Sequence, residues 1–219
     1  MLTITYGYKQ FQTKTISFHE TDLASIQTSI IQAALDTVAG HAGGFVRLSA
    51  GTFTVTGTGK ASGGGLRVGS DTVLMGVGMG ETVISLATGS NSVTGIVRTD
   101  SGGTYADGSA KTTSNVRIEC LTIDGNKAGT KGDVEGFCFV QNADARVQDC
   151  SVLLDRVEIM NVSRYGFDPH VTSAGLTITN CVLDRDSRDA FTIDNTPSAA
   201  TLNTMTSTSF QEKFSALAA

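Results

Sequence analysis

The chain has 219 residues, 40% hydrophobic and 17% charged, and can therefore bury a large core as a single domain. Its 25 glycines, two prolines and lack of tryptophan favour many short strands and turns over a helical bundle. The net charge of -5, without a run of lysine or arginine, argues against nucleic-acid binding, although a local basic patch for a polyanion stays open. The polar N-terminus and the lack of a long apolar run predict neither a cleavable signal peptide nor a membrane span.

One helix is predicted, from Thr21 or Asp22 to about Ala39, with the threonine or aspartate as N-cap and Gly40 as its stop. Its apolar residues at helical spacing are Leu23, Ile26, Ile30, Ala34 and Val38. After the helix, short strand-like runs alternate with turns rich in glycine and serine. The cysteines lack metal-binding spacing and are expected as free thiols in strand or core positions. They are Cys120, Cys138, Cys150 and Cys181.

Three segments of the second half look like copies of one another. They read VRIECLTIDGN (116–126), VLLDRVEIMNV (152–162) and LTITNCVLDRD (176–186). In each, apolar and polar residues alternate and the run ends in a turn of the Asp, Asn or Gly type. The second and third copies are offset by 24 residues, as Ile159 and Leu183 show. A repeat of this length made of short strands indicates a solenoid with one coil per repeat.

The kind of solenoid follows by elimination. Leucine-rich repeats share the period but need an LxxLxL signature that the chain lacks, and a propeller blade needs about 40 residues. This leaves an all-β fold, a right-handed parallel β-helix, in which the early helix caps the exposed end coil. The pattern stops after Asp194. We therefore expect one domain over residues 1–195, truncated at its C-terminal end, and an atypical Ser/Thr/Ala-rich tail over 196–219.

The stretch YGFDPH (165–170) holds a phenol, a carboxylate and an imidazole. Stacking each position on the residue 24 places later would put Asp168 beneath Thr192 and His170 beneath Asp194, about 4.8 Å apart. If Phe167 faces the core, alternation along the strand turns Asp168, His170 and Asp194 to the outer face. The orientation of Tyr165 stays open, because strict alternation points it inward while Gly166 can break the pleat.

A 30-residue step would match Phe137 with Phe167 and place Glu135 beneath Tyr165. Such a cluster suits removal of a proton from carbon next to a carboxylate, with histidine and tyrosine as acid and base and Asp194 orienting the imidazole. Two carboxylates such as Asp168 and Asp194 can instead serve hydrolysis. A purely structural ladder of polar turn residues is the remaining alternative.

The sequence also resembles a known family in its motifs and their order. YGFDPH followed by DAFTID (189–194) resembles the catalytic module of the secreted bacterial mannuronan C5-epimerases, the alginate epimerases. Other matching stretches, in the same order, are VRLSAGTFTVTG (46–57), VGMGETVISL (77–86), VTGIVRT (93–99), LTIDGN (121–126) and VEIMNVSRYGFDPH (157–170). The resemblance covers roughly residues 20 to 194.

This resemblance implies a right-handed parallel β-helix that inverts C5 of β-D-mannuronate within alginate to give α-L-guluronate. The positions that match the family's catalytic residues are Tyr165, Asp168, His170 and Asp194. Arg98 matches a residue that holds the substrate carboxylate, for which a guanidinium is suited. The resemblance further implies calcium dependence, an extracellular or cell-surface location, and a monomer that acts on an anionic polysaccharide without nucleic-acid or membrane partners.

The chain departs from the family in places. Where the family has a lysine and an aspartate, GDVEG (132–136) has Asp133 and Glu135, and Lys131 lies two residues from the lysine position. We expect these three residues to contact substrate. The family continues for several more coils beyond the position of Asp194. The alternatives are therefore an alginate lyase acting by β-elimination, or a truncated β-helix that binds polysaccharide without catalysis.

Overall fold

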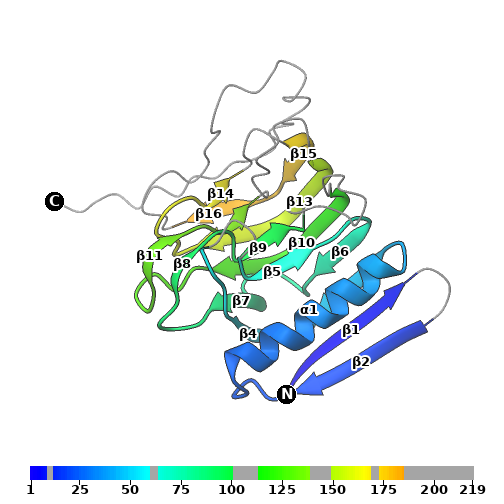
Figure 1. Ribbon diagram of the computed structural model, residues 1–219, viewed down its shortest axis with the longest axis horizontal. Helices are drawn as coiled ribbons and strands as arrows, with labels where there is room; N and C mark the ends of the chain where they lie inside the picture. The colour runs from blue at the N-terminus through cyan, green and yellow to red at the C-terminus, as the bar shows by residue number, and fades with distance from the viewer. Residues whose placement is uncertain (9–11, 60–63, 101–112, 139–148, 169–172, 185–219) are drawn as a thin grey trace, which may run out of the picture.

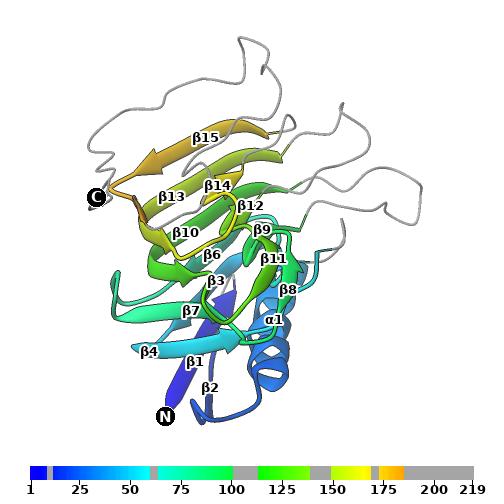
Figure 2. The ribbon, with the colours of Figure 1, turned by 90° about the vertical axis from the view of Figure 1, so that its left-hand side faces the viewer.

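The strands stack into coils that rise from one capped end. The computed structural model describes residues 1–8, 12–59, 64–100, 113–138, 149–168 and 173–184. Parallel pairing joins successive coils, and Figure 2 shows strands β3, β6, β10, β13 and β15 one above the other. The described residues thus form a parallel β-helix with one helix, as predicted. The expected domain boundary at 195 lies outside the described residues.

Three sheets form the walls of the coils. The largest contains β1 (Leu2–Tyr8), β2 (Gln12–Phe18), β3 (Gly44–Leu48), β4 (Gly51–Val55), β6 (Thr72–Met75), β7 (Thr82–Leu86), β10 (Ser114–Asp124), β13 (Asp149–Met160), β15 (Ser173–Thr179) and β16 (Val182–Asp184). A second has β5 (Leu66–Val68), β9 (Val97–Thr99), β12 (Phe137–Cys138) and β14 (Phe167–Asp168). A third pairs β8 (Asn91–Val93) with β11 (Lys131–Val134).

The pairing registers confirm the repeats seen in the sequence. Ile159 pairs with Leu183 at the predicted 24-residue step, and Phe137 pairs with Phe167 at the predicted 30-residue step. The first of the three similar segments pairs with the second in β10 and β13, but there Leu121 meets Val157, 36 residues later. Coil length therefore varies, because the turns between strands differ in length while the strands stay in register.

Corners of the coils are made by single residues in the left-handed conformation. The large sheet bends within β10 at Cys120 (φ 55°) and within β13 at Arg156 (φ 54°), and between β15 and β16 at Asn180 (φ 53°). The flanking registers stack these three residues above one another. A left-handed residue redirects the chain without ending the strand pairing on either side. The bend lets one long strand supply two walls of the coil.

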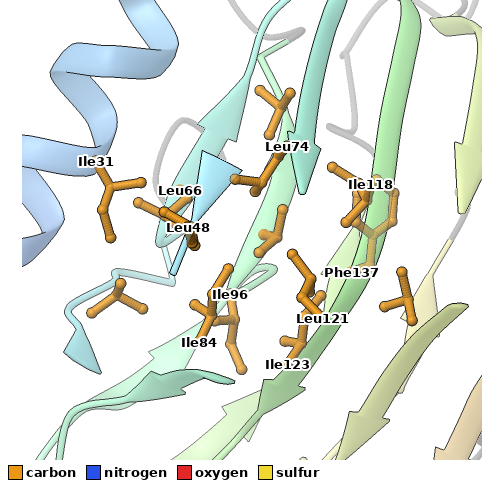
Figure 3. Close-up of a cluster of buried hydrophobic side chains, with 14 of the residues drawn as sticks. Ile31, Leu48, Leu66, Leu74, Ile84, Ile96, Ile118, Leu121, Ile123 and Phe137 are labelled. Carbon is orange, nitrogen blue, oxygen red and sulfur yellow. The ribbon is translucent and has the colours of Figure 1, made fainter. Parts of the chain in front are cut away.

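The core is a column of apolar side chains inside the coils. Figure 3 shows Leu74, Ile118, Leu121 and Ile123 among the side chains that point into this column, all of them fully buried. Successive coils contribute equivalent positions, since Ile123 is paired with Ile159. This arrangement follows from the alternation of apolar and polar residues along each strand, because side chains point to opposite faces with a period of two.

The helix α1 (Ala24–Gly40) caps the first coil, where Figure 1 shows it beside β1 and β2. It begins at Ala24, so the expected start at Thr21 or Asp22 is wrong, and its N-cap residue, Leu23, makes no side-chain capping bond. The Asp22 carboxylate instead accepts a hydrogen bond from the His19 N–H at 2.9 Å. This helix falls short of what a membrane crossing requires.

Two of the apolar residues at helical spacing, Leu23 and Ile26, are exposed. The buried face is instead Gln27, Ile31, Ala34, Leu35 and Val38. Helix side chains bind backbone N–H groups at the edge of the first coil: Gln27 accepts from Thr54 at 3.0 Å and Gln32 accepts from Arg67 at 2.8 Å. These contacts explain the expected capping role, because α1 binds backbone N–H groups at a sheet edge that could otherwise pair with another strand.

The antiparallel hairpin β1–β2 completes the cap, and the sequence analysis missed it. β1 pairs antiparallel with both β2 and β3, which extends the large sheet past the first coil. The strands alternate in composition, but their polar character concealed them. The end of the solenoid is therefore covered by a helix on one side and a hairpin on another.

Replacing Gln27 with leucine is expected to lower the free energy of unfolding by about 2 to 4 kcal/mol. The Gln27 amide donates to the carbonyls of Glu20 (3.1 Å) and Asp22 (2.8 Å), in addition to accepting from Thr54. Urea unfolding measures the change. Ser29→Ala on the exposed face of the same helix is the control and should alter stability by less than about 0.5 kcal/mol. Equal urea midpoints for wild type and Gln27→Leu would refute the capping role.

Candidate active site

The candidate site is built on the sheet of β5, β9, β12 and β14. Its register stacks Arg67, Arg98, Cys138 and Asp168 in one row. The neighbouring row, which includes Phe137 and Phe167, belongs to the core. The rings of this pair stack at 5.7 Å between centroids. The predicted alternation is therefore observed: Phe167 faces the core and Asp168 faces away from it.

Asp168 and Arg98 are covered although they face away from the core. Both side chains are buried, with 0% and 1% of the residue surface exposed. Asp168 lies on the outer face of the strand, as expected, but its side chain is enclosed rather than solvated. A buried charge is stable only when other charges or hydrogen bonds compensate it. The row thus places the Asp168 carboxyl group and the Arg98 guanidinium in a low-dielectric environment.

Arg98 fits because two glycines leave room for it. A Cβ atom on Gly64 would lie 2.4 Å from the Arg98 Cδ, and one on Gly95 would lie 3.1 Å from the Arg98 Cβ. Both glycines have positive φ, of 89° and 75°. Burial lowers the pKa of Arg98, and Cys138, Asp100 and Glu135 oppose that effect. The Arg98 guanidinium is therefore buried close to acidic groups, in a space that exists only because residues 64 and 95 are glycines.

Glu135 joins Cys138 and Asp168 in a buried cluster. One potential ligand atom from each residue lies within 4.8 Å of the other two. Burial and, after it, the nearby Asp168 carboxylate raise the pKa of Glu135 to about 7, against the lowering effect of Arg164. Burial, followed by the two acids, raises the pKa of the Cys138 thiol. At neutral pH the cluster therefore holds a thiol proton and a share of a carboxyl proton.

Arg164 is a site residue that the sequence analysis missed. Its Nη1 donates to the Glu135 Oε1 at 2.8 Å, and its guanidinium carbon lies 4.6 Å from the centre of the Tyr165 ring. The only signal in the sequence is its place before Tyr165. Its partner Glu135 lies 29 residues earlier, on the preceding coil, so the contact depends on the length of that coil.

The remaining predicted residues lie at different distances from this cluster. Tyr165 is half-buried and is not part of the core. Its side chain therefore does not point inward, as strict alternation along the strand would require. Asp133 is exposed, with its Oδ2 atom 4.0 Å from the Arg164 Nε. Lys131 is exposed and makes no ion pair with a described residue. His170 and Asp194 lie outside the described residues, and their placement stays a prediction.

Glu135, Cys138 and Asp168 carry atoms that can ligate a metal ion. They are the one cluster of potential metal ligands found in the described parts of the chain. Calcium takes six to eight oxygen ligands, and a thiol is a poor ligand for it. The cluster therefore does not fit calcium. The two arginines beside it already provide positive charge to its carboxylates. Calcium dependence stays a prediction that follows from the family resemblance.

Comparison with known proteins places this geometry in a family context. No family model matches the chain. "Alginate lyase 7" of Azotobacter vinelandii is 40% identical over 168 residues, which are 76% of this chain and 19% of that protein. "Mannuronan C5-epimerase AlgE5" of the same organism is 40% identical over 176 residues, 79% of this chain and 17% of that protein. The chain therefore spans about a fifth of the length of these relatives.

Solved structures agree with the sequence comparison. The A-module of the A. vinelandii epimerase AlgE4 matches with a TM-score of 0.64 and 37% identity, covering 73% of this chain and 41% of that one. The A-module of AlgE6 matches with a TM-score of 0.65 and 35% identity, covering 74% and 42%. Fold, motif order and sequence identity agree, so this chain belongs to the family of the mannuronan C5-epimerase A-modules and matches a part of such a module.

Proposed function

We propose that this chain acts in the C5 epimerisation of mannuronate residues in alginate. The observation that carries the proposal is the buried cluster beside Tyr165, in which Glu135 and Asp168 lie close together, with Arg98 and Arg164 next to them. The similarity to the mannuronan C5-epimerases supports this reaction over hydrolysis. An anionic polysaccharide is therefore the substrate that we propose.

The chemistry needs positive charge or acidic protons near the substrate carboxylate. Removing the proton from C5 leaves an electron pair that spreads into the adjacent carboxylate, which already carries a charge. Arg98 would offset this charge, and Glu135, with a pKa of about 7, would share a proton with the substrate carboxylate at neutral pH. A proton returned to C5 from the opposite face then completes the inversion, with no other bond broken.

Tyr165 and His170 are the proposed base and acid, because inversion at C5 needs two proton-transfer groups, one on each face of the sugar ring. Tyr165 has left the core and lies beside the cluster. His170 is two residues beyond Asp168 and shares its side of the strand if the alternation continues. Asp168 would orient the substrate, and Asp194 would fix the imidazole tautomer.

A lyase is the second candidate, because "Alginate lyase 7" is similar to the chain over the same region. Both reactions begin with removal of the C5 proton. In the lyase the electron pair forms a double bond between C4 and C5, and the glycosidic oxygen leaves C4 with a proton from the acid. The two outcomes therefore differ in the fate of one shared intermediate. A β-helix that only binds alginate is the non-catalytic alternative.

Incubating the protein with polymannuronate in heavy water distinguishes these functions. The epimerase proposal predicts guluronate in the product and deuterium at C5, both measured by NMR, without growth of the ultraviolet absorbance of unsaturated uronates. Absorbance growth without guluronate would assign the lyase. Binding without any hydrogen exchange would refute catalysis. Running the assay with and without added calcium tests the proposed calcium dependence.

The proposal also covers the location and the oligomeric state of the protein. We infer an extracellular or cell-surface location and a monomeric protein, because the polymer is large and the resemblance is to secreted enzymes. Size-exclusion chromatography with light scattering measures the oligomeric state.

A further inference from the structure

We propose that Arg164 is a substrate-positioning residue that binds a uronate carboxylate and holds Tyr165 in place. This inference rests on the proposed function and deepens it, because it adds a second cation to Arg98. The argument concerns how Arg164 is held, what hydrogen-bonding capacity it retains, and what charge surrounds it.

Arg164 is anchored on three sides. Its backbone N–H donates to the Val134 carbonyl at 3.0 Å, which fixes it on the preceding coil. Its Nη1 donates to the buried Glu135 carboxylate at 2.8 Å. Its guanidinium lies over the Tyr165 ring, with 4.6 Å from the guanidinium carbon to the ring centre. A cation over an aromatic face is attracted to it, so Arg164 restricts the position of the phenol.

The guanidinium also keeps donor capacity for a ligand. It carries five N–H donors. Its Nε atom is buried and makes no hydrogen bond with a described residue, and the nearby Asp133 Oδ2 at 4.0 Å is beyond hydrogen-bond distance. The side chain as a whole is 33% exposed. A carboxylate is the natural acceptor for such a planar donor, because it can take two parallel hydrogen bonds.

Acidic side chains lie around Arg164, so an anionic polymer needs a cation at this place in order to bind. The Asp133 side chain is 51% exposed and the Glu135 side chain is 4% exposed, and both lie beside Arg164, so a uronate that approaches Tyr165 meets two acids. Arg164 lies beside both of them and offsets their charge. Arg164 is therefore the cation that would let a carboxylate come close to Tyr165.

Calorimetric titration of Arg164 variants with two sugars tests the inference. One sugar is a short oligomannuronate and the other is a neutral manno-oligosaccharide of the same length. Arg164→Ala is expected to weaken oligomannuronate binding roughly 10- to 100-fold and to leave binding of the neutral sugar unchanged. Arg164→Lys should recover part of the loss, since it keeps the charge and lacks the bidentate geometry. In turnover assays Arg164→Ala should raise KM and also lower kcat, because Tyr165 loses its restraint.

Arg156→Ala is the matched control. Arg156 is exposed, pairs with Asp155 at 3.0 Å and lies in β13 on another wall of the coil, so its loss should leave binding unchanged. If Arg164→Ala does not fold because Glu135 is left buried without its partner, the double variant Arg164→Ala/Glu135→Gln replaces it, compared with Glu135→Gln alone.

The outcomes separate this inference from the proposed function. Equal oligomannuronate affinity in folded Arg164→Ala and wild type overturns the role of Arg164, whatever the turnover. Wild-type binding that depends on Arg164, without C5 exchange, overturns the catalytic proposal and supports the role of Arg164. A wild-type protein that does not bind oligomannuronate overturns both.

Discussion

Replacing His170 with alanine is expected to lower the rate of C5 hydrogen exchange by a factor of about 100 to 10,000. The reason is that one of the two proton-transfer groups is lost, so that the sugar cannot be protonated or deprotonated from that face. Asp168, two residues earlier, faces away from the core, and His170 is expected on the same side if the alternation continues. The fold should survive, since no core position changes.

Deuterium incorporation at C5 measures this effect, and circular dichroism with thermal unfolding confirms the fold. The chain has three histidines, which provides a matched control. His41→Ala removes an exposed histidine at the end of α1 that stacks on Tyr8 at 4.0 Å, remote in the sequence from the site. His41→Ala should keep the wild-type rate. Full turnover by His170→Ala would remove this residue from the mechanism.

Glu135 is expected to make the protein less stable as the pH rises from about 4.5 to about 7. Its pKa is about 7 in the folded protein against an ordinary value of 4.5. Between these values the folded state binds more protons than the unfolded state, so the free energy of unfolding falls as pH rises. The contribution is fully present below pH 4.5 and is lost above about pH 7. The shift corresponds to about 3 kcal/mol.

Urea unfolding at several pH values, for wild type and Glu135→Gln, measures this contribution as the difference between two curves. Glu135→Gln should lack the decline, because glutamine does not ionise in the site. Glu81→Gln is the control, since Glu81 is an exposed acid in a turn, and it should retain the wild-type decline. Parallel curves for wild type and Glu135→Gln would show that the buried carboxyl does not hold its proton.

Alternation and register made much of the site predictable. Phe167 and Asp168 face opposite sides as expected, because the period of a strand is two whatever the fold. The 24- and 30-residue steps were visible because stacked coils repeat their apolar pattern. The 36-residue step between Leu121 and Val157 shows the limit, since turns of variable length leave no periodic signal.

Helix contacts show a second limit of the sequence. Leu23 and Ile26 follow the apolar spacing of the helix, yet both are exposed, and Gln27 is buried instead. A helix that packs against strands needs apolar residues, whereas one that covers the end of a coil must also satisfy backbone N–H groups. Gln27 does so through Thr54. The polarity of a residue did not reveal its burial, because its partners come from another element.

By itself, the sequence determined the class of fold, the repeat, the side of the strand that carries Asp168, and the motifs that indicate the family. These depend on local periodicity and residue type. Only the tertiary structure decided that Asp168 and Arg98 are enclosed, that Tyr165 leaves the core, and that Arg164 contacts Glu135. These features depend on coil lengths and on which residues cover a given position. Burial and long-range contact are properties of the packed molecule, so no local pattern specifies them.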